Sequence, residues 1–267
     1  MYDVIAMGET MVAFEAQQFG PLREAEDFKK WVGGAADNFI IAVARLGFKT
    51  GWFSRVGDDE LGRFVVRWIR GEGVDVSHVR VDSSKPTGLI LVERRSPEAN
   101  FKCYFYRSTS AATNVCPEDV DEEYLSQAKY IYPEGIMLYV SDSARKAVQK
   151  MFDVALKHNR DVIFDPNLRL TMASAEESRA LVIPLMQKAT YCLPGEDELR
   201  LIMDEDETSA AIKKAHSLGI EKLIVKAGAG GAILAPAGQE PQHMPGFRLG
   251  KYMLSLIHIS EPTRPLY

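Results

Sequence analysis

Four groups of glycines and polar residues follow predicted strands, and an α/β sheet binds ligands beyond the carboxyl ends of its strands. The groups are Gly33-Gly34 with Asn38, then residues 104–107, 165–169 and 226–231. In the first, a glycine pair precedes an apolar helical run. Glycine lets a backbone approach a small polar ligand, and a helix N-terminus offers unpaired N–H donors. This stretch therefore predicts a binding site for a small polar molecule.

Two arginines, Arg107 and Arg169, belong to two of these groups. A guanidinium is a planar fork of donors that suits a carboxylate or a phosphate. Together the two arginines indicate an anionic ligand. The alternative for either one alone is a solvated surface arginine.

The glycine-rich segment 226–231 has neither the GxxxxGK[ST] pattern of a P-loop nor the dinucleotide fingerprint, so by itself it also fits a turn between two strands. The five histidines show no metal-ligand spacing, and there is no GxSxG nucleophile motif. Four acidic residues near predicted helix starts could be ligands or acids, but such residues usually cap helices in solvent. They are Asp37, Asp58, Asp59 and Glu60.

The composition fits one large globular α/β domain with a small appendage, with 267 residues of which 46% are hydrophobic and 26% charged. A formal net charge of -5 without a basic stripe argues against nucleic acid as a partner. Three scattered cysteines argue against a disulfide framework, and the N-terminus lacks the features of a signal peptide. No stretch reaches the roughly 18 apolar residues that span a bilayer. We therefore expect a cytoplasmic protein that does not bind membranes.

The elements that must position these groups alternate between strands and helices. Period-2 and apolar runs predict strands at 2–7, 50–55, 88–93, 100–106, 130–132, 162–164, 191–193 and 223–226. Helical spacing predicts helices at 35–46, 61–70, 141–158, 176–187, 196–203 and 208–218. This order predicts an α/β fold with a parallel sheet covered on both faces and right-handed crossovers.

Two segments do not follow this alternation of strands and helices. Residues 14–30 are polar without a helical period, and the strands at 88–93 and 100–106 have no helix between them. We expect segments 10–32 and 85–108 to form a small accessory sheet that acts as a lid. The helix at 35–46 is expected to place one face inward, and that face comprises Phe39, Ile40, Val43 and Leu46. The helix at 141–158 is expected to place Ala144, Val148, Met151, Phe152 and Ala155 inward.

Taken together, these motifs carry a family resemblance that covers about residues 3–247. The matching residues are Gly33-Gly34, Asn38, Gly47, the run Arg55-Val56-Gly57-Asp58-Asp59-Glu60-Leu61-Gly62, Pro86-Thr87-Gly88-Leu89, Tyr104-Phe105-Tyr106-Arg107 before Ser110-Ala111, and Asp165-Pro166-Asn167-Leu168-Arg169. Ile40 departs from a small-residue position. The sequence resembles the ribokinase-like carbohydrate kinases of the PfkB type, and within them the 2-keto-3-deoxygluconate kinases. The resemblance implies a three-layer αβα fold with a mainly parallel central sheet and a small β lid.

The resemblance also implies roles for individual residues. Glu9, Gly33, Gly34 and Asn38 would line the sugar floor, and Tyr106, Arg107 and Arg169 would hold the hydroxyls and carboxylate of a sugar acid. Glu198 falls in the family's Asn-x-x-Glu motif, which serves the Mg²⁺ water shell, although Gly195 replaces the Asn. Lys226, Gly228 and Gly231 match the Lys-x-Gly-x-x-Gly turn that borders the ATP site.

No catalytic residue is assigned. In this family the base is the Asp of a later Gly-Ala-Gly-Asp loop, whose helix N-terminus also forms the anion hole, and no such loop follows Gly231. Residues 254–267 instead resemble the translation of a sequencing-library adapter, so we expect residues 1–253 to be an incomplete kinase domain and the rest a non-native tail. The alternative is a divergent terminus in which Leu256, Ile257 and Ile259 form a last strand. We expect the chain to have little activity and poor solubility.

The function implied is ATP- and Mg²⁺-dependent phosphorylation of 2-keto-3-deoxygluconate to its 6-phosphate in sugar-acid catabolism. One alternative is a fructokinase or another neutral-sugar kinase. The other is a non-catalytic protein that binds a sugar acid. A homodimer or higher homo-oligomer through the lid is a further expectation.

Overall fold

The computed structural model describes residues 1–96 and 100–246. It divides into two compact units, residues 1–115 and, among those described, residues 116–246. The tail predicted at 254–267 lies outside the described residues. Within the described part of the chain, no helix has the length and apolar character needed to cross a membrane.

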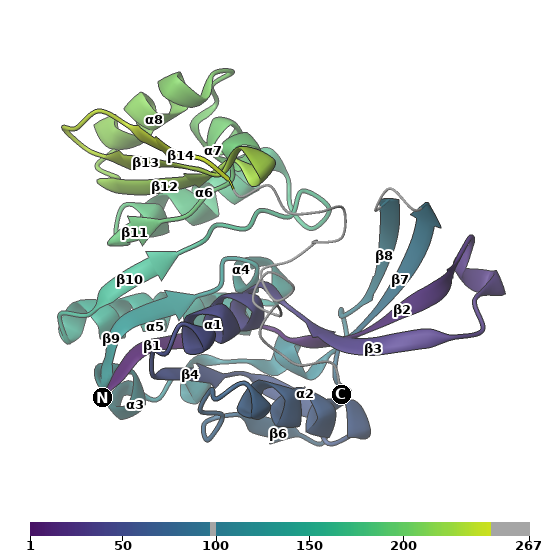
Figure 1. The fold of residues 1–267 in the computed structure, drawn as a ribbon. Helices are drawn as coiled ribbons and strands as arrows, with labels where there is room; N and C mark the ends of the chain where they lie inside the picture. The colour runs from purple at the N-terminus through teal and green to yellow at the C-terminus, as the bar shows by residue number, and fades with distance from the viewer. Residues whose placement is uncertain (97–99, 247–267) are drawn as a thin grey trace. The chain divides into compact units, whose positions relative to one another are not determined.

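The first unit contains two strands that belong to a parallel sheet, a separate four-stranded sheet and a small two-stranded one (Figure 1). Its strands are β1 (Tyr2–Met7), β2 (Met11–Phe19), β3 (Phe28–Gly33), β4 (Thr50–Phe53), β5 (Arg55–Gly57), β6 (Arg80–Asp82), β7 (Leu89–Ser96) and β8 (Asn100–Tyr106). Its helices are η1 (Leu22–Glu24), α1 (Ala35–Arg45), α2 (Glu60–Gly71) and η2 (Ala111–Asn114).

Strands β1 and β4 run parallel, with Val4 opposite Thr50 and Met7 opposite Phe53. Both strands are apolar, and α1 lies between them in the sequence as the crossover that parallel strands need. The inward face predicted for α1 is confirmed at Ile40, is only partly buried at Phe39 and Val43, and is wrong at Leu46. The helix buries Ala36, Asp37, Ile40 and Ile41, whereas Leu46 is 77% exposed.

The four-stranded sheet has the order β3-β2-β7-β8. Its strands come from the two segments predicted to form an accessory sheet, although residues 14–30 are mostly strand rather than irregular. A parallel β2·β7 pair joins two antiparallel hairpins, and one face gathers a buried cluster. The cluster consists of Met11, Ala13, Ile90 and Val92, with Trp31 and Cys103 packed against it. The role of this sheet as a lid stays a prediction.

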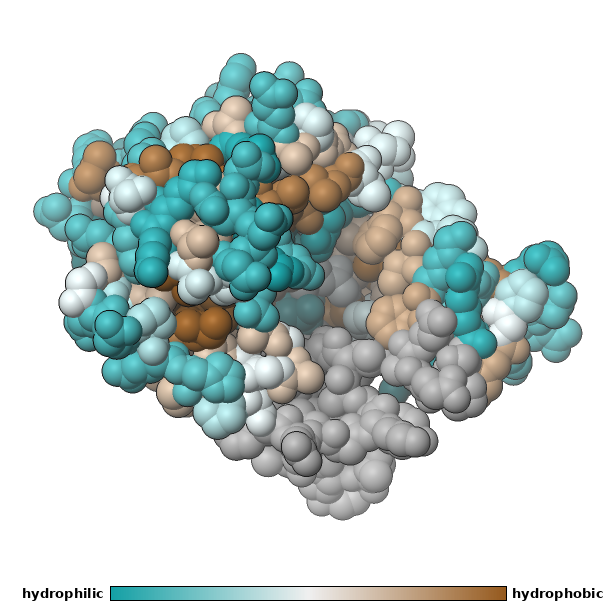
Figure 2. Space-filling model, turned by 90° about the horizontal axis from the view of Figure 1, so that it is seen from above, coloured by the Kyte–Doolittle hydropathy of each residue, from teal (hydrophilic) through white to brown (hydrophobic). Residues whose placement is uncertain are grey.

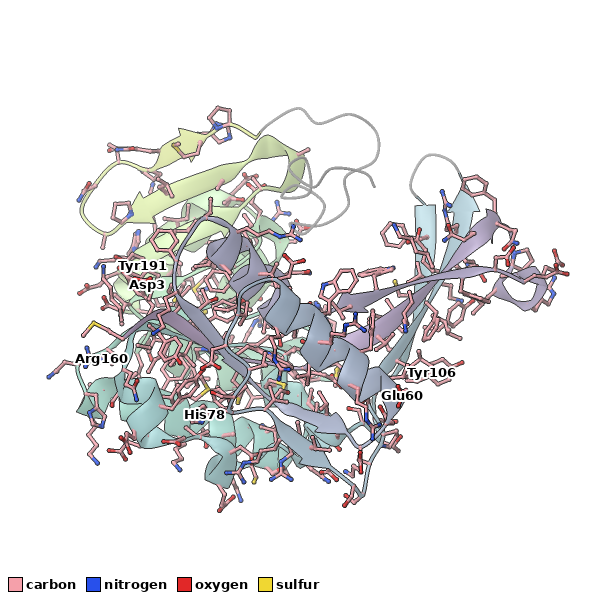
Figure 3. The ribbon with its side chains drawn as sticks, turned by 60° about the horizontal axis from the view of Figure 1, so that its bottom comes forward. Asp3, Glu60, His78, Tyr106, Arg160 and Tyr191 are labelled. Carbon is pink, nitrogen blue, oxygen red and sulfur yellow. The ribbon has the colours of Figure 1, made fainter. Side chains whose placement is uncertain are left out.

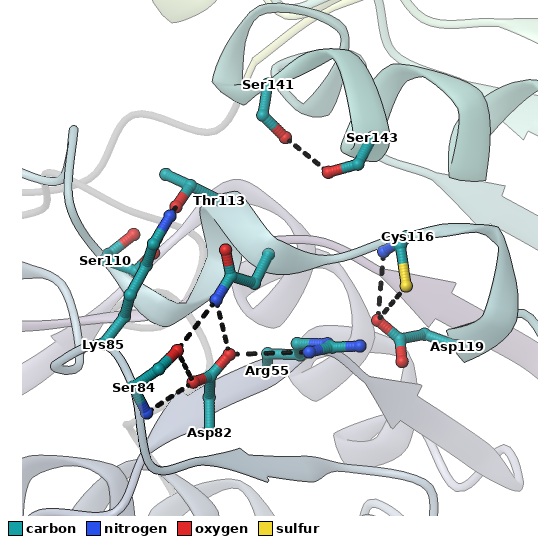
Figure 4. Close-up of polar contacts among 11 residues, drawn as sticks. Arg55, Asp82, Ser84, Lys85, Ser110, Thr113, Cys116, Asp119, Ser141 and Ser143 are labelled. Atoms are coloured by element: carbon teal, nitrogen blue, oxygen red, sulfur yellow. Dashed lines mark hydrogen bonds and ion pairs between the residues drawn. The ribbon is translucent and has the colours of Figure 1, made fainter.

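A carboxylate network ties the loops of the first unit together near β5 and β6 (Figure 4). Asp82 accepts hydrogen bonds from the Ser84 hydroxyl at 2.6 Å and the Asn114 amide at 2.8 Å, and it pairs with Arg55 at 3.5 Å. The hydrogen bond from Ser84 is the main reason that the pKa of Asp82 lies well below its ordinary range. The ionised carboxylate therefore fixes the segment that follows β6 to η2.

Asp59 caps α2 and also holds the next loop. Its carboxylate accepts from the Gly62 amide at 2.7 Å, from the Thr87 amide at 2.8 Å and from the Thr87 hydroxyl at 2.8 Å. Burial alone would raise the pKa of Asp59, but the hydrogen bonds from Thr87 and Gly62 outweigh it and lower the pKa. Asp59 caps a helix as the sequence indicated, whereas its contacts with Thr87 were not predicted.

Replacing Asp59 with alanine is expected to lower the free energy of unfolding by about 1–3 kcal/mol at pH 7, because the cap and the Thr87 amide both lose their acceptor. Since the pKa is lowered in the folded state, this stabilisation is complete above the ordinary value of 3.8 and fades as the pH falls below it. Urea unfolding at pH 7 and at pH 3 measures both effects. The exposed neighbour Asp58, replaced in the same way, should change stability by less than about 0.5 kcal/mol. Equal losses for the two variants would contradict the assignment.

The second unit is a mainly parallel sheet with its helices (Figure 1). Its strands are β9 (Ala128–Pro133), β10 (Asp161–Phe164), β11 (Tyr191–Cys192), β12 (Lys222–Lys226), β13 (Ala232–Pro236) and β14 (Gln242–Met244). Its helices are η3 (Pro117–Asp119), α3 (Glu122–Ser126), α4 (Met137–Val140), α5 (Asp142–Lys157), α6 (Ala175–Met186), α7 (Glu196–Met203), α8 (Thr208–Ser217) and η4 (Gly228–Gly230).

Strands β9, β10, β11 and β12 pair in parallel, and β13 and β14 add an antiparallel edge. Helix α5 packs on this sheet through the face expected from its spacing, because Ala144, Val148, Met151, Phe152 and Ala155 are all buried. The rings of Phe152 and Phe164 lie 5.5 Å apart. The predicted α/β class is thus confirmed, whereas β13 and β14 were not predicted.

The surface seen in Figure 2 is mostly hydrophilic, with hydrophobic residues in small groups. The three cysteines, Cys103, Cys116 and Cys192, are free, as their spacing predicted.

Candidate functional site

In the first unit, a buried ion pair lies at the end of β1. A guanidinium nitrogen of Arg107 contacts Glu9 Oε2, and the Ser110 hydroxyl donates to Glu9 Oε1 at 2.6 Å. Only 1% of the Glu9 side chain and 13% of the Arg107 side chain are exposed. Burying two charges costs several kcal/mol unless geometry and hydrogen bonds compensate. Protein groups such as the Ser110 hydroxyl, rather than water, must therefore offset the cost of burying this pair.

The loop from β3 into α1 passes very close to Glu9. A Cβ on Gly34 would lie 2.2 Å from Asp37 Oδ1 and 2.4 Å from the Glu9 carbonyl oxygen, so only glycine fits there. Gly33 is the last residue of β3 and pairs with Met11. The first unit thus brings Glu9, Gly34 and Arg107 together, as the family resemblance implied.

Three polar atoms in this region have no hydrogen-bond partner among the residues that the structure describes. They are Asp37 Oδ2, Asn38 Oδ1 and Arg107 Nε, and all three are buried. Buried polar groups normally have partners, so unpartnered ones mark a place where a ligand or water completes the network. An amide oxygen, a carboxyl oxygen and a charged donor suit a ligand with hydroxyl groups and an anionic group.

Asp37 differs most from what the sequence predicted, because it is not a solvated cap. It is completely buried, and its only hydrogen bond from another side chain within the described residues is from the Thr10 hydroxyl at 3.2 Å. Burial raises the pKa of Asp37 to about 8, and the Thr10 bond only partly opposes it. Asp37 is therefore a neutral acid at pH 7, and its O–H can donate a hydrogen bond.

Asp37 should make the protein less stable as the pH rises. The pKa of Asp37 in the folded state, about 8, lies above the ordinary value of 3.8. Between these two pH values the folded state therefore retains a proton that the unfolded chain has released. The free energy of unfolding should fall by up to about 1.4 kcal/mol per pH unit between pH 5 and pH 8. Asp37→Asn should remove this slope in urea unfolding at pH 5, 6.5 and 8. Asp58→Asn is the matched exposed control, and parallel curves for Asp37→Asn and the parent would refute the expectation.

Tyr106 lies apart from the buried pair. It ends β8 opposite Leu89, and its side chain is 59% exposed (Figure 3). Its proposed contact with a sugar stays a prediction.

In the second unit, charged side chains meet at the carboxyl ends of neighbouring strands. Lys226, at the end of β12, donates to Asp165 Oδ2 at 2.5 Å, and Asp165 directly follows β10. Burial raises the pKa of Asp165, while the charge of Lys226 opposes that shift. The Lys226 side chain is 44% exposed, so it keeps access to a ligand.

Glu198 lies in the first turn of α7 and accepts two backbone hydrogen bonds. The Gly195 amide donates to Oε2 and the Leu168 amide to Oε1, each at 2.7 Å. A carboxylate oxygen has a second lone pair, so the group can still accept from a water molecule. The geometry is compatible with a role in a metal's water shell and shows in addition a structural role that the sequence did not predict.

The other residues expected in the second unit line the same strand ends. Arg169 follows β10, is partly buried and donates to the Leu168 carbonyl at 2.9 Å. Gly228 and Gly231 have φ of +54° and +97°, a region that glycine adopts without strain. A Cβ on Gly231 would lie 2.0 Å from the Met244 carbonyl oxygen, so the turn packs tightly against the end of β14.

Several residues were missed from the sequence. Thr10 belongs to no motif, and Ser110 matched the family pattern without its bond to Glu9 being predicted. The burial of Asp37 depends on neighbours far along the chain. The Asp165–Lys226 pair was missed, although both residues end predicted parallel strands, which was an available signal.

Comparison with known proteins supports the resemblance. The sequence profile described as "pfkB family carbohydrate kinase" matches residues 1–251. The chain is 37% identical to the 2-dehydro-3-deoxygluconokinase of Thermoproteus tenax over 88% of this chain and 72% of that protein. It is 34% identical to the 5-dehydro-2-deoxygluconokinase of Geobacillus kaustophilus over 86% of this chain and 70% of that protein.

Solved structures show the same fold. The PfkB protein from Polaromonas sp. JS666 has a TM-score of 0.87 at 34% identity, covering 94% of this chain and 84% of that chain. A candidate ribokinase II from E. coli, in complex with ATP and Mg²⁺, has a TM-score of 0.85 at 25% identity, covering 93% and 80%. The ribokinase-like α/β fold is therefore confirmed, and the chain belongs to the pfkB family of carbohydrate kinases.

Proposed function

We propose that this carbohydrate kinase acts on a sugar acid, with 2-keto-3-deoxygluconate as substrate and its 6-phosphate as product. The observation that carries the proposal is the state of Arg107. This residue is buried beside Glu9 in the first unit, and its Nε has no hydrogen-bond partner among the described residues. A guanidinium has five N–H donors, so the ion pair with Glu9 leaves donors for a substrate carboxylate. Asn38 supplies an acceptor for a hydroxyl group, and the protonated Asp37 supplies a donor.

Residues of the second unit fit ATP and Mg²⁺. Lys226 is a partly exposed ammonium beside a tight glycine turn, and Asp165 and Glu198 are carboxylates at neighbouring strand ends. Mg²⁺ prefers one or two carboxylates together with phosphate oxygens and water, so this donor set suits it. Bound MgATP would supply the transferable phosphoryl group. Lys226 would orient a phosphate, and Asp165 would hold Lys226 in place.

The printed sequence contains no Gly-Ala-Gly-Asp loop, so we propose that this chain binds substrate but turns it over slowly. We also propose that residues 1–253 are the kinase portion and that 254–267 derive from an adapter. The nucleotide sequence beyond codon 253 tests the second proposal, because codons unrelated to the adapter would exclude it.

Calorimetric titration of the 267-residue chain with three sugars tests the substrate. We expect saturable binding of 2-keto-3-deoxygluconate, and weaker binding of 5-keto-2-deoxygluconate and of fructose. Preference for fructose would indicate the neutral-sugar alternative. Preference for 5-keto-2-deoxygluconate would match the Geobacillus relative instead. A coupled ADP-release assay on a version carrying a family C-terminus separates a kinase from a non-catalytic binding protein, which would bind without turnover.

We further propose association of copies through the four-stranded sheet, and a cytoplasmic location. The support for association is that Phe101 and Phe105, on one face of β8, are 42% and 55% exposed. Sedimentation of the purified chain measures this association, and a monomer at micromolar concentration would exclude it.

A further inference from the structure

The exposed face of α2 carries three arginines at helical spacing. Arg63, Arg67 and Arg70 lie at i, i+4 and i+7, which places them on one side of the helix that begins at Glu60. They line a pocket of about 290 Å³ whose apolar wall is formed by Val56, Val66 and Val81. Val81 is 63% exposed, so the pocket offers an apolar surface as well as charge.

The three arginines differ in their partners. Arg63 pairs with Asp58 at 2.9 Å and with Glu60 at 3.5 Å. Neither Arg67 nor Arg70 has an ion pair with any of the residues described in the structure, and Asp58 is the one acidic residue that lines the pocket. Two guanidinium groups are thus free to bind an anion, on a chain whose overall formal charge is -5. The positive charge is therefore local to this pocket.

Hydrogen bonds fix the glycine part of the pocket lining. Gly57 and Gly62 line the pocket, and their amides donate to the Thr87 hydroxyl at 2.9 Å and to Asp59 at 2.7 Å. A Cβ on Gly62 would lie 2.3 Å from the Gly57 carbonyl oxygen, so the two backbones are in direct contact. A preformed wall reduces the ordering cost of binding.

We propose that this pocket binds a small organic phosphomonoester. A phosphomonoester carries a charge of about -1.5 to -2 at pH 7, which matches two unpaired arginines. Guanidinium forks bind phosphate oxygens in bidentate fashion, and the valine wall accommodates an apolar body next to the phosphate. The site lies within the first unit, and none of its lining residues is among those assigned to the sugar or to ATP.

Phenyl phosphate is the probe, because it combines a phosphomonoester with an apolar ring. Calorimetric titration of the full chain should show saturable binding that weakens about 10-fold or more in Arg67→Gln/Arg70→Gln, since each lost charged hydrogen bond has an effect of that order. Val81→Glu should weaken binding similarly, because its carboxylate would occupy the arginines. Arg67→Lys/Arg70→Lys keeps the charge but loses the fork, so it should bind with intermediate affinity.

Two control variants test whether the loss of phenyl phosphate binding is specific to this pocket. Arg23→Gln/Lys213→Gln removes the same charge at two exposed positions outside the pocket and should leave affinity within about 2-fold. Arg107→Gln, in the proposed sugar site, should also retain phenyl phosphate binding. No saturable binding, equal affinity in Arg67→Gln/Arg70→Gln and the parent, or an equal loss in the Arg23→Gln/Lys213→Gln control would overturn the proposal. None of these results depends on the sugar specificity or on turnover.

Discussion

Gly34→Ala is expected to lower the free energy of unfolding by about 2–4 kcal/mol and to abolish sugar-acid binding. The new Cβ would lie 2.2 Å from Asp37 Oδ1 and 2.4 Å from the Glu9 carbonyl oxygen. The Glu9 oxygen belongs to the backbone just after β1, so the loop cannot relax without moving that strand end. Urea unfolding and calorimetric titration with 2-keto-3-deoxygluconate measure the two effects.

Two other glycines serve as matched controls. A Cβ on Gly33 would meet the Ile90 and Trp31 side chains at 3.3 Å, so Gly33→Ala should cost about 1 kcal/mol. A Cβ on Gly71, at the end of α2, would meet nothing within 4 Å, and Gly71→Ala should be neutral or stabilising by up to about 1 kcal/mol. If Gly34→Ala behaved like Gly71→Ala, the close approach described here would be wrong.

Arg107→Met is expected to lower the free energy of unfolding by about 3–5 kcal/mol, because it leaves the buried Glu9 carboxylate without its positive partner. The double variant Glu9→Gln/Arg107→Met should regain part of this loss, since no charge then remains buried. The two single variants and the double variant form a cycle that isolates the pair. Urea unfolding at pH 7 is the measurement.

The exposed pair of Arg23 and Glu24 is the matched control. Its side chains are 79% and 66% exposed, so Arg23→Met should change stability by less than about 0.5 kcal/mol. A loss in Arg107→Met no larger than in Arg23→Met would show that the Glu9–Arg107 contact does not stabilise the fold.

The fold was predictable where an element's own pattern decides its burial. Helix α5 follows a regular apolar spacing, and each residue expected inside is buried. The inward face of helix α1 was predicted only in part, because that face includes Asp37, which a hydrophobic pattern assigns to solvent. The prediction for residues 14–30 was wrong because the tip of the β2–β3 hairpin, residues 17–19 and 28–30, is exposed on both faces, so its strands lack a strong apolar alternation.

The candidate site was predictable as a set of motifs but not as a set of contacts. Glu9, Gly34 and Arg107 were found through family spacing, and the first unit does bring them together. Ser110 lies 101 residues after its partner Glu9, and Lys226 lies 61 residues after its partner Asp165. Contacts at such separations depend on strand order, which no local pattern encodes.

The bond between Glu9 and Ser110 also constrains the order of folding during synthesis. Strand β2 pairs with β7, and Glu9 meets its partners only when residues 107–110 have left the ribosome. In residues 116–246, by contrast, each strand pairs with the next one in the chain. Loops that close late slow folding, and local pairing speeds it. We therefore expect the N-terminal unit, although made first, to fold more slowly than the unit that follows it.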